Sequence, residues 1–266
     1  NKSVVYNFMD FRKKCRIYAL QQSNIQLENF SRLGVIADWK NSYYTMSYDF
    51  ESNIINSLKK IIKCNSLYRA EKPVYWCFSC ESSLAEAEIE YFKKSCNSIF
   101  VSFYFKNFLF LSYIFFYFCV LSFIFYKCSI LIWTTNPWTL FSNEAVSLNP
   151  YKNYVLILIG INLYILCLKL LKLLLKKCNI FSYKILGCFI GKRIFNFYLH
   201  HPILNKSIVI ICDNNIDMNI GTGCVHIAPS HGHDDYIIGL KNNLQIKNII
   251  NSTGFFYHDV FFVHLF

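Results

Sequence analysis

From about residue 97 onward, the chain is a series of short apolar runs rich in β-branched and aromatic residues. Runs of this length and composition are typical of β-strands. Many short strands with one or two helices indicate a β-barrel-like domain that is inserted into a different fold. The predicted strands span residues 98–103, 130–135, 154–159 and 208–212, and a helix rich in Leu and Lys is predicted at 164–177.

The first part of the chain has a helical pattern instead. Residues 10–33 and 49–64 carry apolar side chains at helical spacing, and Asp10 is placed to cap the first of these helices. The chain therefore changes from helices to strands along its length.

Residues 107–126 carry no charge and lie between Lys106 and Lys127. Twenty such residues are long enough to cross a bilayer as a helix. Taken by itself, the run has three interpretations. It is a transmembrane helix, an apolar insertion packed on the domain, or a translated stretch of AT-rich non-coding DNA.

The formal net charge is +11, which favours polyanionic partners because neutralised phosphates release counterions. A codon bias toward A and T explains the same excess of Lys equally well. The twelve cysteines are irregularly spaced, which favours reduced thiols in an intracellular compartment over a disulfide scaffold. Cys77 and Cys80 have CxxC spacing, but they are at most half of a zinc site, so we expect no metal.

Three segments have the residue types of a binding or catalytic site. Residues 133–140 include adjacent threonines before a proline, which places hydroxyl donors and acceptors at a stiff strand end. Residues 221–229 include a Gly-Thr-Gly turn, where a backbone can approach a ligand closely, followed by His226. Asp235 follows nine residues later. Each feature also has a structural interpretation, and Asp234 in particular is expected to cap a helix that begins near Tyr236.

Together and in this order, these segments resemble the class I isoleucyl-tRNA synthetases of bacterial or organellar type. The resemblance includes Ala-Glu-Ala-Glu-Ile-Glu-Tyr at 85–91, Thr-Thr-Asn-Pro-Trp-Thr-Leu at 134–140, Gly-Thr-Gly-Cys-Val-His at 221–226 and Asp-Asp-Tyr at 234–236. It implies an α/β chain. By this resemblance, residues 1–92 would be part of a class I Rossmann-type catalytic core with its connecting segment. Residues 93–266 would be an inserted β-barrel-like editing domain with helices, interrupted by an apolar insertion at about 104–128.

The resemblance bears on the uncharged run as well. In the family, the strands at 98–103 and 130–133 belong to one compact domain with a short connection, and a membrane span there would separate them. We therefore expect no membrane partner and favour the non-coding interpretation of the run.

The activity implied by the resemblance is hydrolysis of Val-tRNA(Ile), which corrects errors of the ligase. A synthetic pocket distinguishes Ile from Val by one methylene, worth only about 1–3 kcal/mol. Asp235 would bind the α-ammonium of the misattached amino acid, and Thr134 and Thr135 would position the terminal adenosine or the attacking water. The other expected substrate-binding residues are His226, which would exclude Ile by size, and Asn136, Trp138 and Asn143. Asn136 and Phe141 depart from the family pattern, which has Thr and Pro there.

The resemblance also predicts partners and cofactors. Editing needs no cofactor, whereas the whole ligase uses ATP and Mg²⁺. The expected partner is tRNA(Ile) carrying a misattached amino acid, with no DNA, and the expected state is a monomer in the cytoplasm, a mitochondrion or a plastid. The chain is expected to be a fragment that lacks its native start. The alternatives are an inactive remnant or faulty gene model, and a membrane protein built on residues 107–126.

Overall fold

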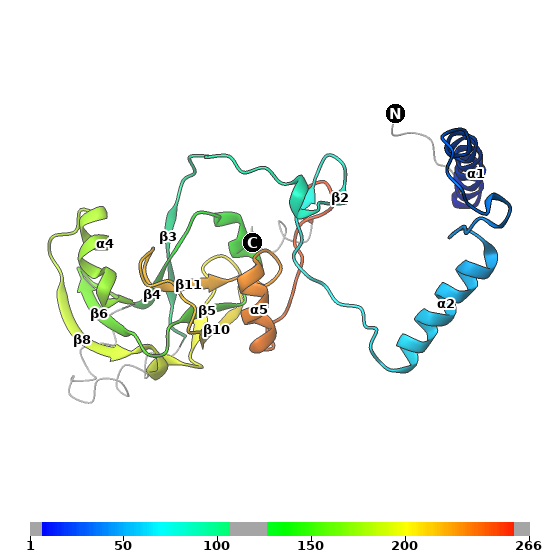
Figure 1. Ribbon diagram of the computed structural model, residues 1–266. Coiled ribbons are helices and arrows are strands. Elements are labelled where there is room, and N and C mark those ends of the chain that lie inside the picture. The colour runs from blue at the N-terminus through cyan, green and yellow to red at the C-terminus, as the bar shows by residue number, and fades with distance from the viewer. Residues whose placement is uncertain (1–6, 107–126, 258–266) are drawn as a thin grey trace. The chain divides into compact units, whose positions relative to one another are not determined.

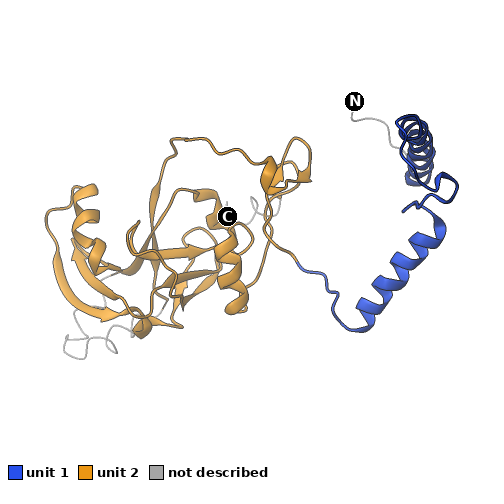
Figure 2. Ribbon diagram, viewed as in Figure 1, with its two compact units in different colours: residues 1–70 blue, residues 71–266 orange. Residues whose placement is uncertain are grey.

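The computed structural model describes residues 7–106 and 127–257. The chain divides into two compact units, residues 1–70 and residues 71–266 (Figure 2). The predicted division between residues 92 and 93 stays a prediction.

The first unit consists of helices. Its elements are α1 (Phe8–Arg32), the 3-10 turn η1 (Trp39–Asn41) and α2 (Tyr48–Lys63). Both predicted helices are present, but Asp10 is not the cap of α1, because the side chain of Asn7 accepts the hydrogen bond from Met9 N. Arg16 and Glu51 form an ion pair of 2.6 Å between the two helices. The described part of this unit contains no strand, so the Rossmann-type core stays a prediction.

The second unit begins with a small hairpin that contains the CxxC turn. Its strands are β1 (Trp76–Cys77) and β2 (Ser82–Ser83), and the 3-10 turn η2 (Glu86–Glu88) follows. Trp76 Nε1 donates to Ser252 O at 2.8 Å, and Ser252 Oγ donates to Glu81 at 2.8 Å. The hairpin is therefore hydrogen-bonded to the last described turn of the chain.

A five-stranded sheet forms one layer of this unit, in the order β3-β4-β7-β6-β8. All neighbours are antiparallel except β4 and β7, which are parallel. The strands are β3 (Ile99–Tyr104), β4 (Lys127–Thr134), β6 (Asn153–Ile159), β7 (Asn162–Cys167) and β8 (Lys184–Ile190). The predicted strands at 98–103, 130–135 and 154–159 are thereby confirmed. The helix predicted at 164–177 is wrong in its first part, because β7 continues to Cys167.

A four-stranded sheet forms the second layer, in the order β11-β5-β10-β9. Its strands are β5 (Ala145–Leu148), β9 (Tyr198–His200), β10 (Ser207–Cys212) and β11 (Cys224–Ile227). The strand predicted at 208–212 is β10, which runs parallel to β5. Short 3-10 turns lie between the strands of both sheets: η4 (Pro137–Ser142), η5 (Leu168–Leu170) and η6 (Gly191–Ile194).

The main core lies between the two sheets. Phe103, Ile130, Val146 and Leu199 are all fully buried in it. The sheets approach each other where Phe105 bridges to Leu199 and where β11 packs near β4. Neither sheet closes on itself within residues 71–106 and 127–257, so the described part of the domain is a pair of open sheets and not a closed barrel.

Two helices cover the outer faces of the sheets (Figure 1). The helix α4 (Leu171–Lys177) packs its leucines on Val155, Ile157 and Leu166 of the five-stranded sheet. The helix α5 (His233–Lys241) packs Ile238 on Ala145, Ile211 and Ile227 of the four-stranded sheet. In β11, Cys224 lies in the main core and Val225 packs on the side of α5, so consecutive residues face opposite sides of the sheet, as strand alternation requires.

The predicted apolar insertion at 104–128 lies mostly outside the described residues. At its edges, β3 extends to Tyr104 and β4 starts at Lys127, and Phe105 N donates to Cys128 O at 3.0 Å. Residues 104–105 and 127–128 therefore lie side by side at the edge of the described segments. None of the described helices is long and apolar enough to cross a membrane.

Candidate functional site

One wall of the candidate site is the turn that follows β4. Thr134, at the end of the strand, is buried, and its hydroxyl oxygen accepts a hydrogen bond from Asn136 N at 3.0 Å. Pro137 then starts η4, since proline suits the first position of a helical turn. Thr139 donates its hydroxyl proton to Asn136 O at 2.8 Å. The turn is thus held by its own side chains.

His226, on β11, faces this turn. Its Nε2 lies 3.4 Å from the hydroxyl oxygen of Thr139. Because the Thr139 proton is already given to Asn136 O, the hydroxyl accepts from Nε2–H, which places the neutral ring's proton on Nε2. Nδ1 is then a buried acceptor, and it has no donor among the described residues. Burial lowers the pKa of His226 to about 4, so the imidazole is neutral at pH 7.

Asn143 connects the same turn to β11. Its side chain is fully buried, and Oδ1 accepts from Ile227 N at 3.1 Å. The next residue, Glu144, donates its backbone N–H to Ile227 O at 2.9 Å. These two bonds fix the end of η4 against the strand that carries His226. In this structure, Asn143 therefore holds the turn after β4 against β11.

The Gly-Thr-Gly turn leads into β11 and is also closely packed. Gly223 has φ +72°, and a Cβ at this position would lie 2.4 Å from Cys167 Cβ, so only glycine fits. Thr222 is buried and bonds the backbone of Cys224. The fully buried Tyr154 donates from its hydroxyl to Gly223 O at 2.8 Å. The turn is therefore a rigid start for the strand.

Asp235 approaches the other end of β11 from helix α5. Its Oδ2 accepts from Ala228 N at 2.9 Å, one residue after the strand. Burial raises the pKa of Asp235 to about 6, and the Ala228 bond opposes this shift. The other carboxylate oxygen has no bonded partner among the described residues, so it is the atom that can receive a cation. Asp234 is exposed, and the prediction that it caps a helix near Tyr236 is wrong, because α5 begins at His233 after Gly232.

Trp138 and His231 form an aromatic pair at the surface of the site. Their ring centroids are 4.9 Å apart in an edge-to-face arrangement, and 40% of Trp138 is exposed. His231 lies on the loop between β11 and α5, and burial lowers its pKa. The pair therefore joins the turn after β4 to the segment before Asp235. An exposed aromatic face of this kind can stack on a nucleobase.

Of the remaining predicted residues, Thr135 is half-buried and Asn136 is exposed. Asn136 takes part in the turn through its backbone, and its side chain makes no capping hydrogen bond. This explains how Asn occupies the position where the family pattern has Thr. Phe141, the other departure, packs its ring edge-to-face on Phe256 at 5.5 Å.

The structure thus brings the predicted residues to one region around the end of β11. His226 faces the turn after β4, whereas Asp235 comes from the helix on the opposite face of the sheet. Sequence reasoning missed Thr139 and His231 as members of this region. Thr139 belongs to the threonine-rich segment, but nothing in the segment alone shows that it contacts His226.

No metal centre is apparent in residues 7–106 and 127–257, where His, Cys, Asp and Glu form no group of three that could hold an ion. Cys77 and Cys80 lie on the same turn, with Cys80 N donating to Cys77 Sγ at 3.4 Å.

Comparison with protein families identifies the class to which the chain belongs. The chain belongs to the class I tRNA synthetases (I, L, M and V), whose family model matches residues 1–255. Within this family, the chain is similar to bacterial isoleucine–tRNA ligases. It is 41% identical to the one from Wigglesworthia glossinidia brevipalpis over 93% of this chain, and 40% identical to the one from Thioalkalivibrio sulfidiphilus over 92%. The chain spans 26% of the length of each of these relatives.

Solved structures give weaker matches. The editing domain of the cytosolic leucyl-tRNA synthetase of P. knowlesi is 19% identical, with a TM-score of 0.47, over 58% of this chain and 68% of that one. The corresponding P. falciparum domain is also 19% identical, with a TM-score of 0.44, over 55% of this chain and 67% of that one.

Proposed function

We propose that the second unit is the editing site of an isoleucine–tRNA ligase and hydrolyses Val-tRNA(Ile). The observation that carries the proposal is the meeting of two separate segments at β11. Thr139 contacts His226 at 3.4 Å, and Asp235 contacts Ala228 at 2.9 Å. The family membership and the identity of the relatives support the same conclusion.

The proposed reaction is attack of water on the ester bond between the amino acid and the tRNA. Asp235 binds the α-ammonium through its unpaired oxygen, in a charge-assisted hydrogen bond. The hydroxyls of Thr134 and Thr135 position the terminal adenosine or the water, and Trp138 offers a surface for the base. No covalent intermediate is required, because positioning alone accelerates such a reaction.

Discrimination against Ile is assigned to His226. Its imidazole is 7% exposed and is held by Thr139, so it cannot easily move aside for a larger side chain. A fixed imidazole would overlap with the additional methylene of an isoleucyl group and exclude it, whereas a mobile side chain would move aside. The valyl group fits and is hydrolysed.

We propose further that residues 1–92 belong to the Rossmann-type core and connecting segment of the same ligase. The complete enzyme would join isoleucine to tRNA(Ile) with ATP and Mg²⁺, as class I synthetases do, and would act as a monomer in the cytoplasm or an organelle. Editing itself would need no cofactor.

The test is deacylation of Val-tRNA(Ile) by the purified chain, measured beside Asp235→Ala. We expect release of valine above the uncatalysed rate, and loss of that release in the variant. A folded chain that releases no valine would refute the proposal and favour an inactive remnant. Equal hydrolysis by both proteins would show that Asp235 has no part in the reaction.

A further inference from the structure

Most of the net positive charge of the protein arises in one segment. Residues 145–212 contain nine of the 27 Lys and Arg residues and none of the 16 Asp and Glu residues. A codon bias toward A and T increases Lys, but it does not remove acidic residues from one segment and retain them elsewhere. The charge is therefore a local property of this part of the domain.

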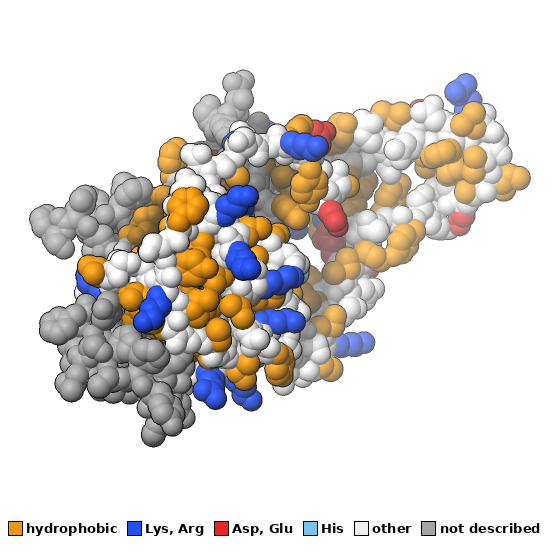
Figure 3. Space-filling view, turned by 90° about the vertical axis from the view of Figure 1, so that its left-hand side faces the viewer, with side chains coloured by type: hydrophobic (Ala, Val, Ile, Leu, Met, Phe, Trp, Pro, Cys, Tyr) orange, Lys and Arg blue, Asp and Glu red, His pale blue; other side chains and the backbone are white. Residues whose placement is uncertain are grey.

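Most of this charge faces solvent. Lys206 is paired with Glu144 at 2.7 Å, but the remaining eight basic residues are exposed. They lie on the β5–β6 turn, η5, α4, β8 and η6. Figure 3 shows this side of the molecule, where Lys and Arg side chains are spread among hydrophobic ones. Such a surface attracts polyanions.

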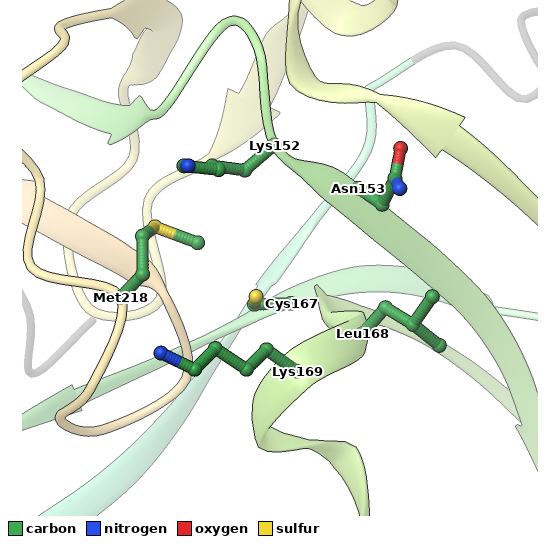
Figure 4. Close-up of a pocket in the computed structure, with 6 residues that line it drawn as sticks. All are labelled: Lys152, Asn153, Cys167, Leu168, Lys169 and Met218. Carbon is green, nitrogen blue, oxygen red and sulfur yellow. The ribbon is translucent and has the colours of Figure 1, made fainter.

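A pocket lies within this surface. Its volume is about 300 Å³, and it is lined by Lys152, Asn153, Cys167, Leu168, Lys169 and Met218. Figure 4 shows the two lysine side chains extending from opposite sides of the pocket toward the loop that carries Met218. No carboxylate lines it. The pocket therefore combines two positive charges and one amide with an apolar floor.

The two ammonium groups differ in their partners. Lys169 Nζ donates to Asn219 Oδ1 at 2.7 Å, which fixes its position without neutralising its charge. The ammonium group of Lys152 has no hydrogen bond or ion pair in the described part of the chain, and only its backbone oxygen is bonded, to Gly191 N. Asp217 is the acidic residue next to Met218 in the loop. Its carboxylate accepts from Asn219 N at 2.8 Å. One lysine is thus held in place and the other is available for an anion.

The pocket lies next to the turn that leads into β11, the strand that carries His226. Cys167 and Met218, which line it, are the side chains packed against Gly223. From Gly223, β11 leads to His226 in three residues, or about 10 Å of extended chain. An anion in the pocket would therefore be bound about one strand length from the site.

We propose that Lys152 and Lys169 bind a backbone phosphate of the RNA whose acylated end enters the site at His226. The identity of the RNA, as the one whose acylated end is hydrolysed, rests on the proposed editing function. The basic surface and the pocket are independent of that function. Lysine ammonium groups bind phosphate as point charges, and the apolar floor accommodates a ribose or base. A concave pocket next to the site favours an RNA strand over a flat membrane surface.

The experiment measures binding of the full chain to fluorescent oligouridylate and oligoadenylate of about twelve nucleotides, within the range that single-strand grooves bind. The variant is Lys152→Ala/Lys169→Ala. The matched control is Lys176→Ala/Lys177→Ala, which removes the same charge from exposed positions of the same basic segment. Circular dichroism confirms that all three proteins are folded.

We expect the pocket variant to bind both RNAs roughly tenfold more weakly, because a phosphate contact does not depend on the base. The slope of log affinity against log salt should fall by about 1. The control should change both quantities much less. Equal losses in the two variants would mean diffuse attraction without a pocket, and unchanged binding in the pocket variant would overturn the proposal.

Two additional measurements separate this inference from the proposed function. Vesicles with anionic lipid replace RNA in one series, and lysine-dependent binding to vesicles but not to RNA would overturn the inference in favour of a membrane surface. Val-tRNA(Ile) deacylation is measured in the other. A raised KM with unchanged kcat in the pocket variant supports the phosphate site. If RNA binding depends on the two lysines but the unmodified chain does not deacylate Val-tRNA(Ile), the phosphate site is supported and the editing function is refuted.

Discussion

The hydroxyl oxygen of Thr139 lies 3.4 Å from Nε2 of His226, although 87 residues separate them in the chain. Thr139 thereby connects the turn after β4 to β11, and it determines which nitrogen of the imidazole carries the proton. Thr139→Val keeps the shape of the side chain but removes the bond. We expect a loss of about 1 kcal/mol in stability and a roughly tenfold slower deacylation of Val-tRNA(Ile). Thr139→Ser should restore both, and failure of this rescue would show that the hydroxyl is unimportant.

The charge of Asp235 can be separated from its structural bond. Asp235→Asn retains an oxygen that can accept from Ala228 N, whereas Asp235→Ala removes both the acceptor and the charge. We expect the Asn variant to melt no lower than the unmodified protein but to lose roughly 10- to 100-fold in deacylation, as expected for one charge-assisted contact. The Ala variant should lose activity and stability together. Asp234→Ala, at the exposed neighbour, is the control and should behave like the unmodified protein.

The pH dependence of the protein should reveal the same carboxyl group. The folded-state pKa of Asp235 is raised from 3.8 to about 6, so the folded chain holds this proton more tightly than the unfolded chain does. The associated stability is present below about pH 4 and is lost as the pH rises through 6. Asp235→Asn cannot ionise, so its melting temperature should increase relative to the unmodified protein between pH 4 and 7. If the difference in melting temperature between the two proteins is constant from pH 4 to 7, Asp235 does not have the raised pKa.

Deacylation should follow the opposite trend, because the ionised form of Asp235 binds the ammonium. We expect the rate to rise with pH through about 6, and the residual rate of Asp235→Asn to lack this rise. His226, with its pKa lowered to about 4, stays neutral over this range and should not contribute.

His226 is expected to determine the size limit of the site. His226→Ala removes a buried ring, and the enlarged space should accept the isoleucyl group. We predict that the variant hydrolyses Ile-tRNA(Ile) at least about tenfold faster than the unmodified chain, since one methylene is worth about 1–3 kcal/mol. Retained hydrolysis of Val-tRNA(Ile) shows that the site is intact. His200→Ala, at an exposed position, should not change the preference; if His226→Ala also leaves it unchanged, discrimination lies elsewhere.

The Gly223 turn should tolerate no side chain. Gly223→Ala would place Cβ 2.4 Å from Cys167 Cβ at φ +72°, so both overlap and backbone strain oppose it. Gly160→Ala is a matched control, because Gly160 also has positive φ (+58°) but no atom within 4 Å. We expect a loss of about 1 kcal/mol for Gly160→Ala and at least about 2–4 kcal/mol for Gly223→Ala, measured by urea unfolding. Similar losses would show that the packing against Cys167 is not rigid.

Local sequence patterns predicted a large part of the fold. The apolar runs at 98–103, 154–159 and 208–212 correspond to β3, β6 and β10, because alternating or continuous apolar residues of this length favour strands. The pattern failed at residues 164–167, where Leu and Ile suit a buried strand and a helix equally well. β5 and β11 were not predicted, since four-residue strands are too short to show a period. The sheet order was not predicted either, because it depends on pairings between distant segments.

By itself, the sequence determined the family and the chemical groups available to the site: the threonine-rich turn, the Gly-Thr-Gly turn, His226 and Asp235. Only the tertiary structure decided the surroundings of these groups. The neutral state of His226 and the raised pKa of Asp235 are consequences of burial by other segments. The pairing of Lys152 with Lys169 across one pocket depends on the packing of two turns. Desolvation and the geometry of contacts arise from atoms far apart in the chain, and a linear pattern does not contain them.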